Sequence, residues 1–295
     1  MNPRRSPLTS LLPVLLAFAC GEPSGGHDSG STGSEESSGG ADDAGAPGDA
    51  SSHTQGHTTD PGSDTTGDAA SDDGATDTSV TPECTPGPVP CEDALVLDLS
   101  LVAAVSQGVV TNTADGDGWR TEVDARAGGL PGLSTNPWVY LRFEQQGAVR
   151  VEIDDFEALE SEEWHIAAKR YALRLNGGSG GPSCVAAAAL VDQSYEAIDA
   201  RGDAVAELES FYDDSCTLQD DGMGLGAPGY TLTPWWTYPG CVATTAVPFV
   251  IDLPDGGAIK LVVDSYYGSG QANCNDTGTM GSDAGRFVWR WAQLP

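Results

Sequence analysis

The chain has 295 residues, of which 44 are acidic and 13 basic, and its formal net charge at pH 7 is −31. Such a charge repels the phosphate backbone of DNA and RNA, so it disfavours nucleic acid as a partner. A basic partner, a cation or a neutral apolar ligand stays compatible with it. Residues 84–295 alone hold 11 basic and 30 acidic residues, so the acidic excess is not confined to one end of the chain.

Residues 1–19 have the pattern of an export signal. A short basic segment precedes an apolar run that is too short for a membrane-spanning helix. The small residues Ala17 and Ala19 before Cys20 resemble a bacterial lipobox, which predicts that Cys20 carries lipid and anchors the protein in a lipid bilayer. The alternative is an ordinary signal peptide that is cut near Ala19 and leaves Cys20 free.

Residues 20–83 are predicted to be the lipidated cysteine followed by a disordered acidic linker. The segment is mainly Gly, Ser, Thr, Asp, Ala and Pro, and from Gly21 to Glu83 it has no Lys, Arg or aromatic residue. Such a composition cannot bury enough apolar surface to offset the entropy lost on ordering. His27, His53 and His57 are interpreted as solvated side chains rather than metal ligands. Residues 84–295 are then expected to form one globular domain.

The domain contains six of the seven cysteines, an even number that predicts three disulfides in an exported protein. Cys84 and Cys91 flank a proline-rich segment, and we expect them to pair with each other. A zinc site is the alternative, and it is disfavoured because no Cys-x-x-Cys pair is present. The six residues are Cys84, Cys91, Cys184, Cys216, Cys241 and Cys274.

The first part of the domain has the pattern of consecutive β-strands. A turn is expected at 116–118, where Asp115 and Asp117 resemble a fragment of a calcium loop that lacks the remaining ligands. A glycine-containing loop at 145–147 would join two strands as an antiparallel hairpin. Apolar residues alternate, or aliphatic residues cluster, over 95–101, 119–127, 138–143 and 149–153, and these are the predicted strands.

The carboxylates between Asp154 and Glu163 are interpreted as a solvated acidic loop. The alternative is the acid/base pair of a glycoside hydrolase, but no companion signal for such a site is present.

The stretch from Trp164 to Leu175 is predicted to be a single strand whose apolar side changes midway, and it ends at the glycine-rich turn 176–182. A short helix is expected within 195–211. Long exposed loops are expected at 213–229, which carries Met223, and at 268–283, which carries Met280.

Two motifs resemble the signature of the HmuY family, bacterial haem-binding lipoproteins. The first is Trp-x-Ile-Ala-x-Lys-Arg-Tyr at 164–171, followed by Asn-Gly-Gly-Ser-Gly at 176–180. In this motif His165 stands where the family usually has an aspartate. The second is the block 249–261, which leads to two tyrosines and a closing aromatic strand at 285–291. The strand pattern and the resemblance together predict an all-β domain of two antiparallel sheets with long glycine-rich loops.

Members of this family hold haem between loops with two axial side chains, commonly histidines and in some members methionines, supplied after the Asn-Gly-Gly turn. No histidine follows Asn176 in this sequence, so a bis-histidine site is excluded. The resemblance instead makes Met223 and Met280 the candidate haem ligands. His165 is a further candidate, although its place in a central strand favours a hydrogen bond to a neighbouring strand or loop. The candidate pocket residues are Tyr230, Trp235, Trp236 and Tyr238.

The resemblance implies a non-catalytic lipoprotein that binds haem for uptake and passes it to a receptor. The domain has a single histidine and no Gly-x-Ser-x-Gly elbow, which disfavours the usual hydrolases. Because Gly21 rather than aspartate follows Cys20, the outer membrane is the expected location, on either face. The alternative is a surface-exposed binding or interaction module of the same fold that does not bind haem and uses the aromatic cluster at Trp235 and Trp236.

Overall fold

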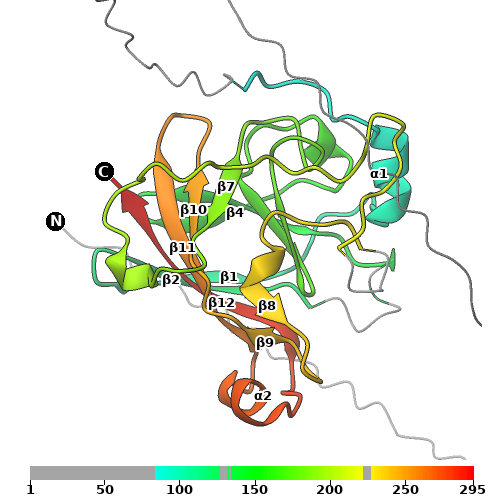
Figure 1. Ribbon diagram of the computed structural model, residues 1–295. Helices are drawn as coiled ribbons and strands as arrows, with labels where there is room; N and C mark the ends of the chain where they lie inside the picture. The colour runs from blue at the N-terminus through cyan, green and yellow to red at the C-terminus, as the bar shows by residue number, and fades with distance from the viewer. Residues whose placement is uncertain (1–83, 127–131, 133, 222–226) are drawn as a thin grey trace, which may run out of the picture. The chain divides into compact units, whose positions relative to one another are not determined.

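Two antiparallel β-sheets form most of the domain in the computed structural model, which describes residues 84–126, 132, 134–221 and 227–295 (Figure 1). The larger sheet has the strand order β1-β2-β12-β11-β10-β7, the smaller one β4-β3-β5-β6, and β8 pairs with β9 separately. The strands are β1 Val110–Asp115, β2 Gly118–Asp124, β3 Val139–Glu144, β4 Gly147–Val151, β5 Ile166–Lys169, β6 Ala172–Leu175, β7 Ala186–Ala189, β8 Trp236–Thr237, β9 Ala243–Thr244, β10 Phe249–Asp252, β11 Ala258–Tyr267 and β12 Ala284–Leu294. The predicted fold class, all-β with two antiparallel sheets, is confirmed.

Helices are short and few among the described residues. Two are α-helices and three are single 3-10 turns, and none of them is long and apolar enough to cross a membrane. They are α1 Glu92–Asp98, α2 Ala272–Thr277, η2 Glu157–Leu159, η3 Tyr195–Ala197 and η4 Thr233–Trp235.

The main hydrophobic core lies between the two sheets. Phe143 of β3 and Trp291 of β12 approach each other across it, with ring centroids 4.8 Å apart. Aliphatic and aromatic residues of both sheets, nearly all with little exposed surface, fill the remaining space. Removing this apolar surface from water supplies the main driving force for folding.

The β5–β6 hairpin of the smaller sheet is buried on both of its faces. All four residues of β5 are buried, so Ile166 and Ala168 face the main core, while Ala167 faces a second hydrophobic core on the other side. This outer core contains Trp138, Tyr140 and Trp164, and α1 packs on it through Leu95. The outer side of this hairpin is therefore an interior surface.

Asn112 joins the two sheets at one edge. Its side-chain nitrogen donates to the Ala148 carbonyl at 2.9 Å and its side-chain oxygen accepts the Ala148 N–H at 3.0 Å, as a paired backbone residue would. The Thr121 hydroxyl donates to the same oxygen at 2.7 Å and accepts the Trp291 indole N–H at 2.8 Å. The amide thereby connects β4 to the core of the larger sheet.

Asn176 ties down the glycine-rich turn after β6. It is fully buried, and its side-chain nitrogen donates to the carbonyls of Ser161 at 3.0 Å and Trp164 at 2.7 Å. Its side-chain oxygen accepts the Ser183 N–H at 3.2 Å. Gly178 has φ +60, and a Cβ there would lie 2.2 Å from a backbone oxygen, so this turn requires glycine.

The predicted single strand 164–175 is wrong in connectivity. β5 and β6 are an antiparallel hairpin in which Lys169 pairs with Ala172, and Arg170 takes φ 53 in the two-residue turn between them. Such turns usually contain Gly, Asn or Asp, and none of these residues is present at Arg170 and Tyr171 to indicate a turn. The change in the apolar side arises from the two-residue turn, because Ile166 and Ala168 before it pair with Leu175 and Leu173 after it on the same face.

The first predicted strand, 95–101, is also wrong. Its first part, up to Asp98, belongs to α1 and Leu99 is the C-cap of that helix. The buried Leu95 and Leu99 lie four residues apart on one side, and Leu97 is 77% exposed on the other. A short aliphatic run fits a strand and a helix equally well, and only the packing against Trp138 and its neighbours decides between them.

The predicted strands 119–127, 138–143 and 149–153 are present as β2, β3 and β4. The turn at 116–118 closes the β1–β2 hairpin, and the loop at 145–147 closes the β3–β4 hairpin.

The helix expected within 195–211 is limited to η3, whereas the loop 268–283 contains the unpredicted α2. In the acidic stretch before β5, Asp155 is buried rather than solvated.

The expected Cys84–Cys91 disulfide is wrong. The six cysteines do form three disulfides, but these are Cys84–Cys184, Cys91–Cys216 and Cys241–Cys274. The chain after Cys84 runs beside the glycine-rich turn, where the Gly87 N–H donates to the Pro182 carbonyl at 2.9 Å. Two long-range bonds therefore hold the entry segment and α1 against the outer core.

We predict that Asn176→Ala lowers the free energy of unfolding by about 3 kcal/mol. The substitution leaves two carbonyls and one N–H without their partner in a buried turn, and each unsatisfied group is costly. Urea unfolding followed by tryptophan fluorescence measures the change. Asn273→Ala, at an exposed position of α2, is the control and should change stability by less than about 0.5 kcal/mol. Equal effects of the two substitutions would contradict the role given to Asn176.

Candidate ligand site

The outer core contains charged side chains, which protein interiors rarely bury. Arg174 is fully buried, and its guanidinium lies 4.9 Å, 5.4 Å and 5.0 Å from the ring centroids of Trp138, Tyr140 and Trp164. Its Nη2 donates to the Tyr140 hydroxyl at 2.6 Å, and that hydroxyl donates to Asp155 at 3.1 Å. Arg174 and Asp155 are therefore linked through a tyrosine rather than paired directly.

Asp155 connects three segments of the chain. Its two oxygens accept the backbone N–H groups of Val102 and Trp138, each at 2.9 Å. Burial raises the pKa of this carboxyl, and the two N–H donors oppose that rise because they stabilise the charged form. The carboxylate fixes the chain after α1 against the start of β3.

Lys169 lies beside this cluster, on the wall of a cavity of about 140 Å³. The side chain is only 3% exposed, and its ammonium donates to the carbonyls of Ser100 at 3.2 Å and Leu99 at 3.5 Å. Burial lowers the pKa of Lys169 to about 8, although the charge of Asp155 favours the protonated form. The other walls include Leu99, Trp138, Tyr171, Ala172, Pro228 and Tyr230.

Glu209 is a second buried carboxyl, placed under the edge of β6. It accepts the N–H of Leu175 at 2.9 Å, and the N–H and hydroxyl of Thr231 at 2.8 Å and 2.9 Å. Burial raises its pKa to about 7 despite these donors. Its contacts hold the chain at Thr231 against the smaller sheet, so its role is structural.

The four candidate pocket residues lie in different surroundings. Trp235 and Trp236 are buried in the main core, while Tyr238 is 54% exposed. Tyr230 is buried and lines both the 140 Å³ cavity and a second void of about 10 Å³, which it shares with Trp235 and Trp236. The smaller void is no larger than one water molecule, so the tryptophans stabilise the fold rather than line an open pocket.

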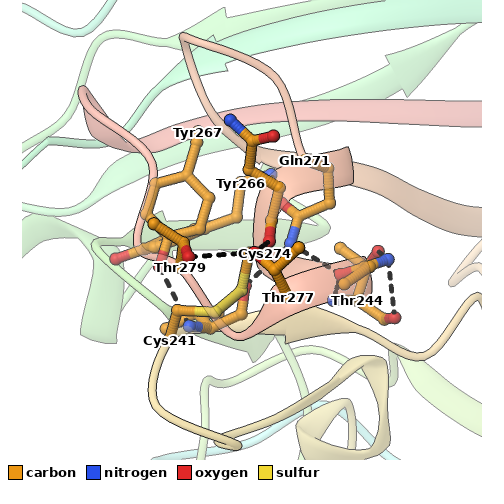
Figure 2. Close-up of a disulfide and its surroundings, with 11 residues drawn as sticks. Cys241, Thr244, Tyr266, Tyr267, Gln271, Cys274, Thr277 and Thr279 are labelled. Atoms are coloured by element: carbon orange, nitrogen blue, oxygen red, sulfur yellow. Dashed lines mark hydrogen bonds between the residues drawn. A yellow bond between two sulfur atoms is a disulfide. The ribbon is translucent and has the colours of Figure 1, made fainter.

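Met280 and Tyr238 lie on what we call the disulfide lobe, residues 236–244 and 268–283. Figure 2 shows the Cys241–Cys274 disulfide that joins its two halves. Gln271 strengthens the joint by donating to the Val242 carbonyl at 2.8 Å and accepting the Tyr266 N–H at 3.0 Å. Met280 is 59% exposed on this lobe. Met223, the other methionine candidate, lies outside the described residues.

His165 is occupied by a hydrogen bond to a neighbouring strand, as predicted. Its Nδ1 accepts the Phe143 N–H at 3.2 Å, so in the neutral ring the proton is on Nε2. Burial lowers the pKa of His165 to about 4, so the ring is neutral at pH 7. Neither nitrogen offers a free lone pair, which argues against His165 as an iron ligand in this arrangement.

A wider cleft of about 540 Å³ lies between residues 104–108 and the end of β2, near Arg126. None of the predicted site residues lines it. Arg126 is engaged by Asp124, its Nε donating at 2.7 Å. Within the described ranges, no group of three or more His, Cys, Asp or Glu side chains is arranged to hold a metal ion.

The comparison with known families identifies the domain. The model of the HmuY family, described as HmuY protein, matches residues 134–278. This part of the chain is similar to the HmuY family. The match runs from just before β3 to the residue after α2, and so includes the buried hairpin, the Asn-Gly-Gly turn and most of the disulfide lobe. No curated protein matches the sequence.

The solved structures that are similar to this chain include proteins from three bacteria. A Bacteroides vulgatus protein described as HmuY-like and haem-binding has 17% identity and a TM-score of 0.38, covering 62% of this chain and 95% of that one. A Bacteroides fragilis protein described as a lipoprotein has 15% identity and the same TM-score, covering 61% and 91%. The apo HmuY analogue of Tannerella forsythia has 14% identity and a TM-score of 0.32, covering 65% and 98%.

The sequence analysis missed the buried charges Asp155, Lys169, Arg174 and Glu209. A signal existed for two of them: Lys169 and Arg174 interrupt apolar segments on either side of the Arg170 turn, at positions that face the outer core. This signal did not predict buried charges, because a charged residue in a strand usually lies on the solvent face. Nothing local marks Asp155 or Glu209.

We predict that His165 titrates near pH 4, well below the usual imidazole value of about 6.5. The folded-state pKa is depressed, so the stability linked to this group is complete above pH 6.5 and is lost as the pH falls through 4. Two-dimensional NMR of the imidazole resonances measures the pKa. A value near 6.5 for His165 would show that its ring is not buried in this way.

Proposed function

We propose that this protein is a non-catalytic carrier of the bacterial cell envelope that binds haem for uptake. The observation that carries the proposal is the HmuY family match over residues 134–278, which includes the Asn-Gly-Gly turn and Met223 and ends two residues before Met280. The HmuY family is a family of binding proteins rather than enzymes. Lipid on Cys20 would anchor the carrier, and an uptake receptor would receive the haem.

The proposed haem site lies between the segment that leads to Met223 and the disulfide lobe. Asp221 and Trp236 line the same small void as Tyr171, and the rings of Tyr171 and Trp236 are 5.2 Å apart. The 140 Å³ and 10 Å³ cavities are too small for a porphyrin, so haem would bind at the surface. Methionine ligation suits this site because the exposed Met280 thioether is accessible to an iron.

The alternative function is binding of another ligand by the same fold. The observation that favours it is the shortage of iron ligands: His165 is engaged by Phe143, and the strong negative charge of the chain repels the haem propionates. This alternative keeps the envelope location and the lack of catalysis.

A haemin titration tests the haem proposal. We expect residues 21–295, produced with their disulfides, to give a saturable sharp Soret band. Replacing both Met223 and Met280 by leucine keeps the apolar volume but removes the sulfurs, so it should weaken binding at least about tenfold. The control is Leu97→Ala, at an exposed position of α1. A broad spectrum of free haemin, or a Soret band unchanged in the double variant, would favour the alternative.

Lipidation has a separate test. In a bacterial host that processes lipoproteins, labelled palmitate should be incorporated into the full chain and lost on Cys20→Ala. Absence of label from the unmodified chain would point instead to an ordinary signal peptide cut near Ala19.

A further inference from the structure

The 140 Å³ cavity in the outer core has no part in the proposed haem site, and its chemistry indicates a ligand of its own. It lies between the end of α1, the first residue before β3, the β5–β6 turn and residues 227–230. An apolar cavity of about this size can hold one benzene-sized molecule. Most of the walls are aromatic or aliphatic, from Leu99, Trp138, Tyr171 and Tyr230, but one wall is the ammonium-bearing side chain of Lys169.

Among the described residues, Lys169 is a buried cation without an anionic partner. It makes no ion pair with any described carboxylate, and its two hydrogen bonds, to the carbonyls of Ser100 and Leu99, are long. The internal segments outside the described residues, 127–131, 133 and 222–226, contain no acidic residue. A charge removed from water without a partner costs several kcal/mol, so proteins rarely retain one unless something compensates it.

The neighbouring carboxylates do not act as ion-pair partners for Lys169. Asp155 acts on Lys169 through its charge but is already bonded to two backbone N–H groups and the Tyr140 hydroxyl. Asp98, at the exposed rim of the cavity, accepts the Tyr212 hydroxyl at 3.0 Å.

Arg174 is a second buried cation in this region, and its charge acts on the buried carboxyls Asp155 and Glu209. Its guanidinium lies over Trp138 and donates a hydrogen bond to Tyr140, while Nε and Nη1 have no partner among the described residues. The indole N–H of Trp138, on the cavity wall, also lacks one there. The region around the cavity therefore has buried hydrogen-bond donors that no described acceptor satisfies.

We propose that this cavity binds a small organic monocarboxylate, with the carboxylate against the Lys169 ammonium and an apolar body against Leu99, Tyr171 and Tyr230. A single negative charge matches the single cation on the wall. The apolar walls and the volume match a body of about one aromatic ring or a short branched chain. A halide would satisfy the charge but leave most of the cavity unfilled.

Isothermal titration with benzoate and 3-methylbutanoate at pH 7 tests the proposal on residues 21–295. We expect saturable binding of both, binding at least about tenfold weaker for the uncharged benzamide, and loss of at least about tenfold in affinity for Lys169→Met. The matched control is Lys260→Met. Lys260 also donates to two carbonyls, at 2.7 Å and 3.3 Å, and lies over a tyrosine ring, but it is remote from the cavity.

A second variant tests the proposal independently in case Lys169→Met does not fold. Ala227→Phe fills the cavity and leaves every charge in place, so it should also abolish binding, while circular dichroism reports whether each variant is folded. The indole N–H resonance of Trp138 should move on adding benzoate. Equal binding of benzamide, unchanged affinity in folded Lys169→Met, displacement of benzoate by chloride alone, or no binding of either carboxylate would each overturn the proposal.

Discussion

The double burial of the β5–β6 hairpin is the constraint on which the rest of the structure depends. Its inner face packs against the larger sheet, and its outer face packs under α1, Phe211 and Tyr230. Strands buried on both faces leave no solvent side for polar residues. Any charge placed on this hairpin must therefore find its partners inside the protein, which explains the network that links Arg174, Tyr140 and Asp155.

Covering the outer face requires long-range attachment, because α1 is only seven residues long and too short to be stable alone. The Cys91–Cys216 disulfide ties the helix to the opposite side of the outer core, and Asp155 holds the chain that follows it. Cys84–Cys184 fastens the entry segment to the glycine-rich turn. The entry segment and α1 are thus held on the outer face by covalent and polar bonds as much as by apolar burial.

The HmuY signature encodes this architecture more than a ligand. Trp164 and Asn176 hold the glycine-rich turn, Lys169 precedes the β5–β6 hairpin turn and Arg170 lies in it, and Gly178 allows a close backbone approach. A chain can retain all of these residues while the loops that would hold a ligand diverge. This separation explains how a clear family match coexists with the absence of any histidine after Asn176.

The sequence by itself determined the fold class, three of the early strands with their turns, the number of disulfides, and the hydrogen-bonded role of His165. These depend on local alternation, on turn-forming glycines and on residue counts, which are visible along the chain. It did not determine that 95–101 is a helix, that Arg170 sits in a hairpin turn, or that Cys84 pairs with Cys184. Only the tertiary structure decided these, because each depends on which surface a segment meets after folding. The buried charges around Lys169 belong to the same class: a lysine in a strand has the same sequence signal whether its outer face meets water or a second core.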